Sequence, residues 1–459
     1  MKFLAFVAAA PLAAGVASAD VRPDEALAAY VAAPDETFSW HVRARHEMPG
    51  AEIVELRLHS QTWRGTLWKH RLHLIRPDGL DVERHQGLLV IGGGRWRTEY
   101  DGPGEAALDD DAALFAAIAE RLETVVAVVE QVPFQPIFGL REDELIAYTF
   151  EQYLATGESD WPLLLPMVKT AVRAMDTAQA FAAAEWQVDL DRFTVLGGSK
   201  RGWTTWLTGA ADPRATTLVP IVIDVLNFES HMPHQEAMWG APSAQIAPYT
   251  RRGLDDALSS PPGAALRRIV DPYSYRQRLT QPKLIVIATN DEYFPVDSLN
   301  LYWPGLVGPK NVLYLPNEGH DAEDFARLIP ALDAVHRLSA ADERLPTVES
   351  ALETRVGRKL RLCVRANHDP VAVTVWSANS EDTDFRDATF VPSSSVADGG
   401  AHIGEIEPPS AGYRAIFAEA LFDGPNGRYL LSTNVRIIDS DGHSPPPAAA
   451  AEDTSGACP

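Results

Sequence analysis

The sequence predicts an α/β protein: a mostly parallel sheet covered by helices, followed by a small C-terminal β-sandwich-like module. Between residues 51 and 342, unbroken apolar runs alternate with longer segments of helical periodicity. This alternation is typical of strands that are buried on both faces. Between residues 343 and 439 the runs become short and alternating, and turn residues separate them, which favours an antiparallel sandwich.

The expected elements are taken in chain order. A short helix is expected at 26–33, and a turn at 63–65 joins antiparallel strands at 53–58 and 67–75. The apolar runs expected to complete the sheet are 88–91, 124–129, 193–196, 218–223, 283–288 and 311–315. Helices are expected at 112–122, 142–185 (with a break near Gly157 and Pro162), 202–211 and 322–338. The strands of the module are expected at 359–365, 371–376, 414–420 and 429–438.

The first 19 residues have the pattern of an export signal. Lys2 precedes an alanine-rich apolar run from Phe3 to Val16, and Ala17-Ser18-Ala19 matches a small-x-small cleavage site. The run is too short to span a membrane comfortably. We therefore expect a signal peptide at 1–19, a protein exported to a periplasm or the medium, and no integral membrane span.

We expect an α/β core domain at 20–342 with a cap insertion at 229–268, a β-rich module at 343–439 and a disordered tail at 440–459. The net charge of −23 argues against nucleic acid and anionic membranes as partners. Export permits a disulfide between Cys363 and Cys458, the two cysteines of the chain, but their pairing is left open.

A serine stands on a sharp turn in the segment Gly197-Gly198-Ser199-Lys200-Arg201-Gly202, after the strand 193–196 and before a helix. In α/β-hydrolases the nucleophile occupies such an elbow, and small residues flank it because the strand and helix backbones nearly touch. Gly197 meets this need. Arg201 stands where the motif has a second glycine, so Gly202 is expected to take over part of that role.

Two further residues complete a nucleophilic set in the chain order Ser…Asp…His. Asp291 follows the strand 283–288, and His320 lies in the loop after the strand 311–315. Parallel strands end at one edge of a sheet, so these side chains are expected to converge with Ser199. We expect His320 to be the general base and then the acid, and Asp291 to hold its tautomer. Glu292 and Asp297 are the competing carboxylates.

An oxyanion hole is expected from the backbone N–H of Lys200 and from the turn at Gly92–Gly94, through Gly93 and Gly94. The substrate-binding candidates are Arg201, Arg95, Asn227 and His231. Purely structural roles stay open for two of these sites: residues 92–94 could form a plain tight turn, and Arg201 could pair with a structural acid. A metal at His231 and His234 with Glu229 is disfavoured, because Pro233 breaks the helical spacing. We expect no metal and no cofactor.

Several longer motifs resemble the PhoPQ-activated pathogenicity-related protein family, which includes autocrine proliferation repressor-like proteins. The segments that carry the resemblance are Ser60–Gly65, Trp68–His70, Arg141–Thr149, Val172–Asp176, Gly198–Trp203, Asp271–Tyr275, Pro282–Ile285, Asn290–Phe294 and Pro316–His320. The resemblance implies an α/β-hydrolase core followed by a β-rich module. The elbow is also similar to that of glucuronoyl esterases, which implies an ester carrying a carboxylate or a sugar acid.

These observations predict an exported serine hydrolase that cleaves a carboxylic ester of a small molecule or saccharide through an acyl-enzyme. A non-catalytic secreted binding or signalling protein on the same scaffold is the main alternative, and a serine peptidase is another. The sequence leaves open the substrate, the oligomeric state and the role of the β-rich module.

Overall fold

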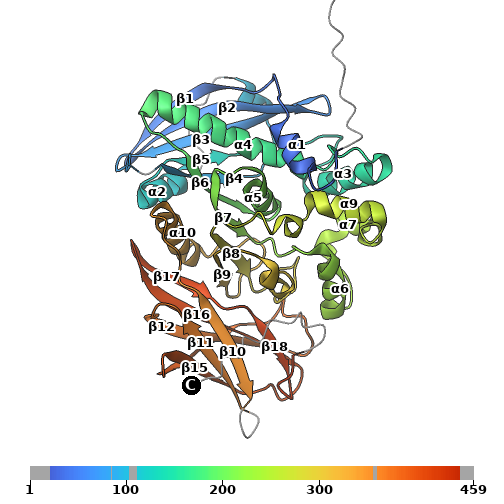
Figure 1. Ribbon diagram of the computed structural model, residues 1–459, viewed down its shortest axis with the longest axis vertical. Coiled ribbons are helices and arrows are strands. Elements are labelled where there is room, and N and C mark those ends of the chain that lie inside the picture. The colour runs from blue at the N-terminus through green and yellow to red at the C-terminus, as the bar shows by residue number, and fades with distance from the viewer. Residues whose placement is uncertain (1–20, 84, 103–110, 355–358, 445–459) are drawn as a thin grey trace, which may run out of the picture.

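A large mixed sheet runs through the computed structural model, which describes residues 21–83, 85–102, 111–354 and 359–444 (Figure 1). Its neighbouring strands follow the order β1-β2-β3-β5-β4-β6-β7-β8-β9 before the sheet continues into the C-terminal part. The strands β1, β2, β3 and β5 pair antiparallel, whereas β5, β4, β6, β7, β8 and β9 run parallel. The bounds of these strands are β1 (Ser39–Met48), β2 (Ala51–Trp63), β3 (Thr66–Pro77), β4 (Gln86–Ile91), β5 (Val126–Val129), β6 (Arg192–Gly198), β7 (Ala215–Ile221), β8 (Lys283–Ala288) and β9 (Lys310–Leu315).

Helices cover both faces of this sheet. One face carries α1 (Ala26–Ala32), α4 (Leu164–Phe181) and α5 (Lys200–Ala211), and the other carries α2 (Ala112–Leu122) and α10 (Phe325–Ala340). Every residue of β4, β5 and β8 is buried. This double cover explains why the parallel strands appear in the sequence as continuous apolar runs.

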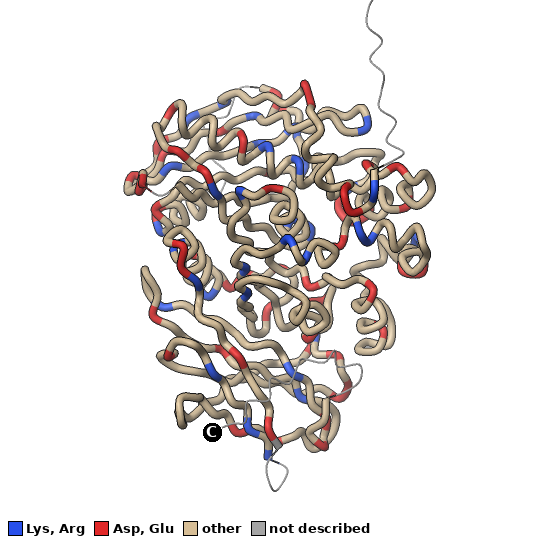
Figure 2. The backbone as a smooth tube through the Cα atoms, viewed as in Figure 1, with Lys and Arg blue, Asp and Glu red and all other residues tan. Residues whose placement is uncertain are grey.

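A group of shorter helices lies beside α3 (Glu142–Thr156), at the right of Figure 1. They are α6 (Phe228–Trp239), η4 (Ala244–Ile246), α7 (Ala247–Thr250), α8 (Leu254–Ala257), α9 (Pro261–Val270) and η5 (Pro272–Tyr275). Acidic and basic residues intermingle in this region (Figure 2), where Arg252 pairs with Glu151 at 2.5 Å and Arg251 pairs with Glu144. The helices from α6 to α9 cover the segment 229–268, for which a cap is predicted, and η5 lies just beyond it.

The C-terminal part is built from two antiparallel sheets. One contains β17 (Gly427–Ser432), β16 (Tyr413–Gly424), β12 (Ala372–Ser380), β13 (Val391–Ser394) and β18 (Arg436–Asp439). The other contains β10 (Val348–Thr354), β11 (Leu360–Ala366), β15 (Ala401–Ile406) and β14 (Val396–Asp398). A side chain at Gly404 would lie 2.6 Å from Val375 Cγ2, so the sheets pack closely. The predicted fold class is confirmed.

The first of these sheets is joined to the core sheet. β17 pairs with β9 through Ser432 and Val312, and the Tyr314 amide donates to Ser432 Oγ at 2.9 Å. The two parts therefore share one continuous sheet. The division of the chain at residue 342 stays a prediction.

Five strands are not among those predicted from the sequence: β1, β10, β13, β14 and β15. β1 and β13 are short of buried residues, so neither has the apolar alternation that marks a half-buried strand. The signal peptide predicted at 1–19, Cys458 and most of the predicted tail lie outside the described residues, while Cys363 is buried on β11 and disulfide-bonded. Within the described ranges no helix is long and apolar enough to cross a membrane.

Candidate active site

Ser199 occupies the turn between β6 and α5 with an unusual backbone, φ 55° and ψ −128°. A non-glycine residue in this region is strained and is held there only by its surroundings. The Ser199 amide donates to Ile221 O at 2.8 Å. A Cβ at Gly197 would lie 2.6 Å from Arg201 O, and one at Gly202 would lie 2.9 Å from Gly197 O. The strand and helix are therefore in contact at these two glycines, and Gly202 fills the role expected of a second small residue.

Ser199, His320 and Asp291 form a continuous hydrogen-bonded chain. His320 Nε2 lies 2.8 Å from Ser199 Oγ, and His320 Nδ1 lies 2.9 Å and 3.0 Å from the two carboxylate oxygens of Asp291. A carboxylate only accepts, so Nδ1 carries the proton and Nε2 is left to accept from the serine hydroxyl. Asp291 is 3% exposed.

The surroundings of Asp291 and His320 fix both side chains. Burial raises the pKa of Asp291, while the hydrogen bond from His320 acts in the opposite direction. The Tyr293 amide donates to Asp291 at 2.8 Å, and the Tyr293 ring lies against His320 with 4.1 Å between centroids. The competing carboxylates have other partners: Glu292 accepts from the His320 amide at 3.1 Å, and Asp297 bonds His234 at 2.7 Å.

The glycine turn after β4 lies beside the elbow. Its carbonyls are all occupied: Gly92 O accepts from Val132 N, Gly93 O from Gln131 N and Gly94 O from the Gln135 amide, at 3.1, 2.7 and 2.8 Å. A Cβ at Gly93 would lie 2.7 Å from the Arg201 guanidinium. The Lys200 amide has no acceptor among the described residues, so it is free to serve as an oxyanion donor.

Arg201 and Lys200 are both neutralised by acids at the start of α3. Arg201 donates from Nε to Val132 O at 2.6 Å and from Nη2 to Glu142 at 2.8 Å. Lys200 Nζ lies 3.1 Å from Glu142 and 3.2 Å from Asp143. Burial would raise the pKa of Glu142, but the charges of Arg201 and Lys200 hold it near 2. Arg201 is thus paired with a structural acid, the second of the two roles expected for it, and lends no support to binding of a substrate carboxylate.

The other three binding candidates occupy different environments. Arg95 is exposed and does not line the cavity beside Ser199. Asn227 is a structural residue, because its amide N–H donates to Asp271 at 3.2 Å and its side chain donates to Leu301 O at 2.9 Å. His231 does lie in the wall of the cavity. Among the described residues no group of three or more His, Cys, Asp and Glu side chains could hold a metal ion.

The cavity beside Ser199 has a volume of about 100 Å³. Core residues supply one side of it and the helices α6 to α8 supply the other. Its apolar walls are formed by Phe150, Trp203, Ile223, Val225, Phe228, Met232, Ile246, Leu254, Leu258 and Phe294. Tyr249 also lines it and donates to Asp143 Oδ1 at 3.0 Å. Such an apolar pocket with few polar groups is typical of a small-molecule site.

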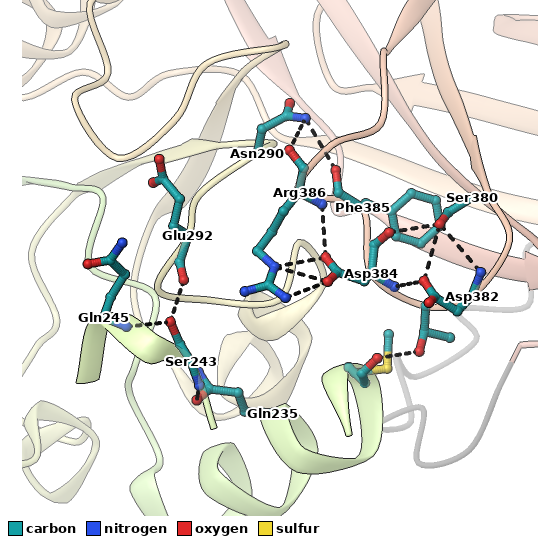
Figure 3. Close-up of polar contacts among 12 residues, drawn as sticks. Gln235, Ser243, Gln245, Asn290, Glu292, Ser380, Asp382, Asp384, Phe385 and Arg386 are labelled. Carbon is teal, nitrogen blue, oxygen red and sulfur yellow. Dashed lines mark hydrogen bonds and ion pairs between the residues drawn. The ribbon is translucent and has the colours of Figure 1, made fainter. Parts of the chain in front are cut away.

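A loop of the C-terminal part holds residues 289–297, the segment after β8 that carries Asp291 and that we call the acid loop (Figure 3). The Asn290 side-chain amide lies 3.2, 3.0 and 2.7 Å from the carbonyls of Phe385, Arg386 and Ala388. We call residues 380–390 the bracing loop. It also reaches residues 316–324, the loop after β9 that carries His320 and that we call the histidine loop. There Asn317 exchanges two hydrogen bonds with Phe390 at 2.7 and 3.0 Å.

The bracing loop contacts the cap region as well. Thr383 Oγ1 donates to Met238 O at 2.6 Å, and the Arg386 guanidinium lies 4.1 Å from the centre of the Trp239 ring. On the opposite side of the acid loop, Ser243 Oγ donates to Glu292 O at 2.6 Å (Figure 3). The acid loop is therefore fixed from two sides, by the bracing loop and by the segment after α6.

Sequence reasoning did not find Glu142, Asp143, Tyr249, Tyr293 or the bracing loop. Glu142 and Asp143 lie in the motif Arg141–Thr149, which carries part of the family resemblance, and this motif is the sequence signal for them. Nothing in the spacing indicated that these acids pair with cations at the elbow, because the partners are 59 residues apart in the case of Arg201.

The strand order from β2 to β9, the elbow between β6 and α5, and the acid and histidine loops after β8 and β9 define an α/β-hydrolase. The comparison with known families is consistent with the resemblance seen in the sequence. Residues 27–386 match the PhoPQ-activated pathogenicity-related protein family, and the chain belongs to that family.

Autocrine proliferation repressor protein A of Dictyostelium discoideum is 30% identical over 429 residues, which span 85% of this chain and 84% of that protein. Among solved structures, acetyl xylan esterase 1 of Thermoanaerobacterium sp. JW/SL YS485 is 14% identical with a TM-score of 0.45, over 68% of this chain and 92% of that one. A glucuronoyl esterase from Solibacter usitatus is also 14% identical, with a TM-score of 0.39, over 67% of this chain and 90% of that one.

Proposed function

We propose that this protein is an exported serine hydrolase that cleaves carboxylic esters through an acyl-enzyme on Ser199. One observation carries the proposal: the unbroken contact from Ser199 Oγ through His320 to Asp291, with the 2.8 Å distance between Oγ and Nε2. A serine hydroxyl is a weak nucleophile until a neighbouring base removes its proton. The contact with His320 Nε2 supports His320 as that base.

The reaction runs in two halves. Ser199 Oγ attacks the ester carbonyl while its proton passes to His320 Nε2, and the negative charge on the carbonyl oxygen is met by the Lys200 N–H. As the tetrahedral adduct collapses, His320 returns that proton to the departing alcohol, and the acyl group stays bound to Ser199. Water then attacks the acyl-enzyme with His320 as base, which releases the carboxylic acid and restores the serine.

Asp291 keeps the proton on Nδ1 and stabilises the imidazolium that forms in each half-reaction. Gly93 and Gly94 remain our candidates for the second oxyanion donor. The support for this is that hydrogen bonds to the three carbonyls of the turn fix its backbone next to Arg201, and a preorganised donor is worth about 3–4 kcal/mol of barrier.

A fluorophosphonate probe tests the proposal, because it labels only an activated serine. We expect the wild-type protein to be labelled, Ser199→Ala to be unlabelled, and a panel of p-nitrophenyl esters to be hydrolysed by the wild type alone. Ser298→Ala is the control, since this buried serine does not line the cavity beside Ser199. An unlabelled, folded wild type would favour a secreted binding or signalling protein, and cleavage of peptides in preference to esters would favour a peptidase.

Export is the remaining part of the proposal and is supported by the leader pattern at residues 1–19. Cell fractionation with N-terminal sequencing tests it. The processed protein is expected outside the cytoplasm with Asp20 as its first residue, and a cytoplasmic protein that keeps Met1 would refute it.

A further inference from the structure

The cavity beside Ser199 is lined by a polar side chain whose ring nitrogens have no partner in the part of the chain that the structure describes. His231 on α6 is 1% exposed, and neither of its ring nitrogens has a hydrogen-bond partner among the described residues. Buried polar groups are paired in the great majority of cases, and each exception calls for an explanation. The next histidine on the same helix shows the difference, because His234 Nε2 bonds Asp297 at 2.7 Å.

His231 lies close to the reacting groups. Its ring contacts Phe294 edge to face, with 5.7 Å between centroids, and Phe294 lies 6.2 Å from the His320 ring on the same measure. Both His231 and Ser199 line the same cavity. A group attached to Ser199 that extends into the cavity would therefore pass within reach of His231.

The size and charge of the cavity restrict what can enter it. A dry apolar cavity of about 150 Å³ holds one benzene molecule, so a cavity of about 100 Å³ suits a short acyl chain rather than a long one. Lys200 is neutralised by Glu142 and Asp143, and Asp143 and Asp255 are in the wall. Burial lowers the pKa of His231 to about 3, so its ring is neutral. These features disfavour an acyl group that carries a carboxylate.

We propose that His231 hydrogen-bonds the acyl group of the substrate, and that this acyl group is short, uncharged and carries one hydroxyl or carbonyl oxygen beyond the ester. This inference rests on the proposed function, since it assigns the acyl side of the same ester. His231 is then a specificity-determining residue: a neutral imidazole both donates and accepts, and a plain alkyl chain would leave both nitrogens unpaired. A site built to bond a substrate hydroxyl rejects the analogue that lacks it.

Two pairs of p-nitrophenyl esters of matched size test this: butanoyl against 3-hydroxybutanoyl, and pentanoyl against 4-oxopentanoyl. We expect the wild type to prefer the oxygen-bearing member of at least one pair by 10-fold or more in kcat/KM. His231→Phe should reduce that ratio to near one. His231→Gln keeps a donor and an acceptor and should restore part of it.

The outcomes are separable. If the wild type hydrolyses these esters but shows no preference in either pair, the inference is overturned and the proposed function stands. A preference that persists in His231→Phe has the same meaning. If the wild type neither reacts with the fluorophosphonate nor hydrolyses any ester, the proposed function fails and the inference fails with it. Labelling of each variant by the fluorophosphonate shows that its elbow is folded. If His231→Phe does not fold, the decisive measurements are the wild-type preference and the ratio of kcat/KM values in His231→Gln.

Discussion

The contact between β6 and α5 at the elbow makes Gly202→Ala a sharp test of the site. The added methyl carbon would lie 2.8 Å from Ile223 Cγ2, 2.9 Å from Gly197 O and 3.0 Å from Ile221 O. Favourable contacts begin at about 3.5 Å, so the helix must move by roughly 0.5 Å or more. Two of the three obstacles are backbone atoms, which side-chain rearrangement cannot relieve.

The size of the effect follows from this displacement. Overpacking a close-packed core costs about 1–3 kcal/mol. Ile221 O also accepts the Ser199 amide at 2.8 Å, so the shift is transmitted to Ser199. A misplacement of about 1 Å costs on the order of 100-fold in rate. We therefore expect Gly202→Ala to lower Tm by a few degrees and the rate of fluorophosphonate labelling by about 10- to 100-fold.

Gly198→Ala is the matched control. Gly198 also adjoins the nucleophile, but a Cβ there would meet nothing within 4 Å. Differential scanning calorimetry and labelling kinetics on the three proteins provide the comparison. If Gly202→Ala keeps the wild-type labelling rate, or if Gly198→Ala loses as much, then strand–helix contact does not set the position of Ser199 and the reasoning fails.

Three further predictions concern the residues around the elbow. Asn290→Ala is expected to destabilise the protein by about 1–3 kcal/mol, because it removes the amide that faces three bracing-loop carbonyls, and to lower kcat. The matched control is Asn300→Ala, which removes a bond to Val435 O at 2.9 Å and one from Asn434 at 3.0 Å, and it should lower Tm with little change in kcat. Equal kcat losses in the two variants would contradict a role of Asn290 in placing the acid loop. Asp291→Asn should leave the fold intact but lower kcat by about 10⁴-fold through the wrong tautomer of His320, and esterase activity within tenfold of the wild type would show that another group orients the imidazole. Burial lowers the pKa of His231 to about 3, so between about pH 6.5 and pH 3 the unfolded chain binds a proton that the folded protein does not. The free energy of unfolding therefore falls as the pH falls through that window, by at most about 1.4 kcal/mol per pH unit. His231→Phe should flatten the decline of Tm between pH 7 and pH 5, and an unchanged slope would show that this ring is not kept neutral.

The parts of the fold that were predictable are those whose residues carry their own signal. The strands β4 to β9 carry apolar runs because helices cover both faces, and Ser199, Asp291 and His320 each lie in the turn or loop that follows such a run. β1 and β13 carry no such signal, because they are exposed edge strands whose position depends on their neighbours.

The support of the site was not predictable for a different reason. The bond from Asn290 to the bracing loop joins residues that are 95 to 98 positions apart, and the loop has neither periodicity nor a motif. The same holds for Arg201, whose sequence context gave equal reason to expect a substrate carboxylate or a structural acid. Only the arrangement in space selects Glu142 as its partner.

The pairing of β17 with β9 has a consequence for folding. β9 ends at Leu315, but the strand that covers its edge begins at Gly427, so that edge stays open until the C-terminal part has folded onto it. An uncovered strand edge is a template for pairing with other chains. We therefore expect polypeptides cut near residue 342 to aggregate, and useful expression boundaries to lie after β18.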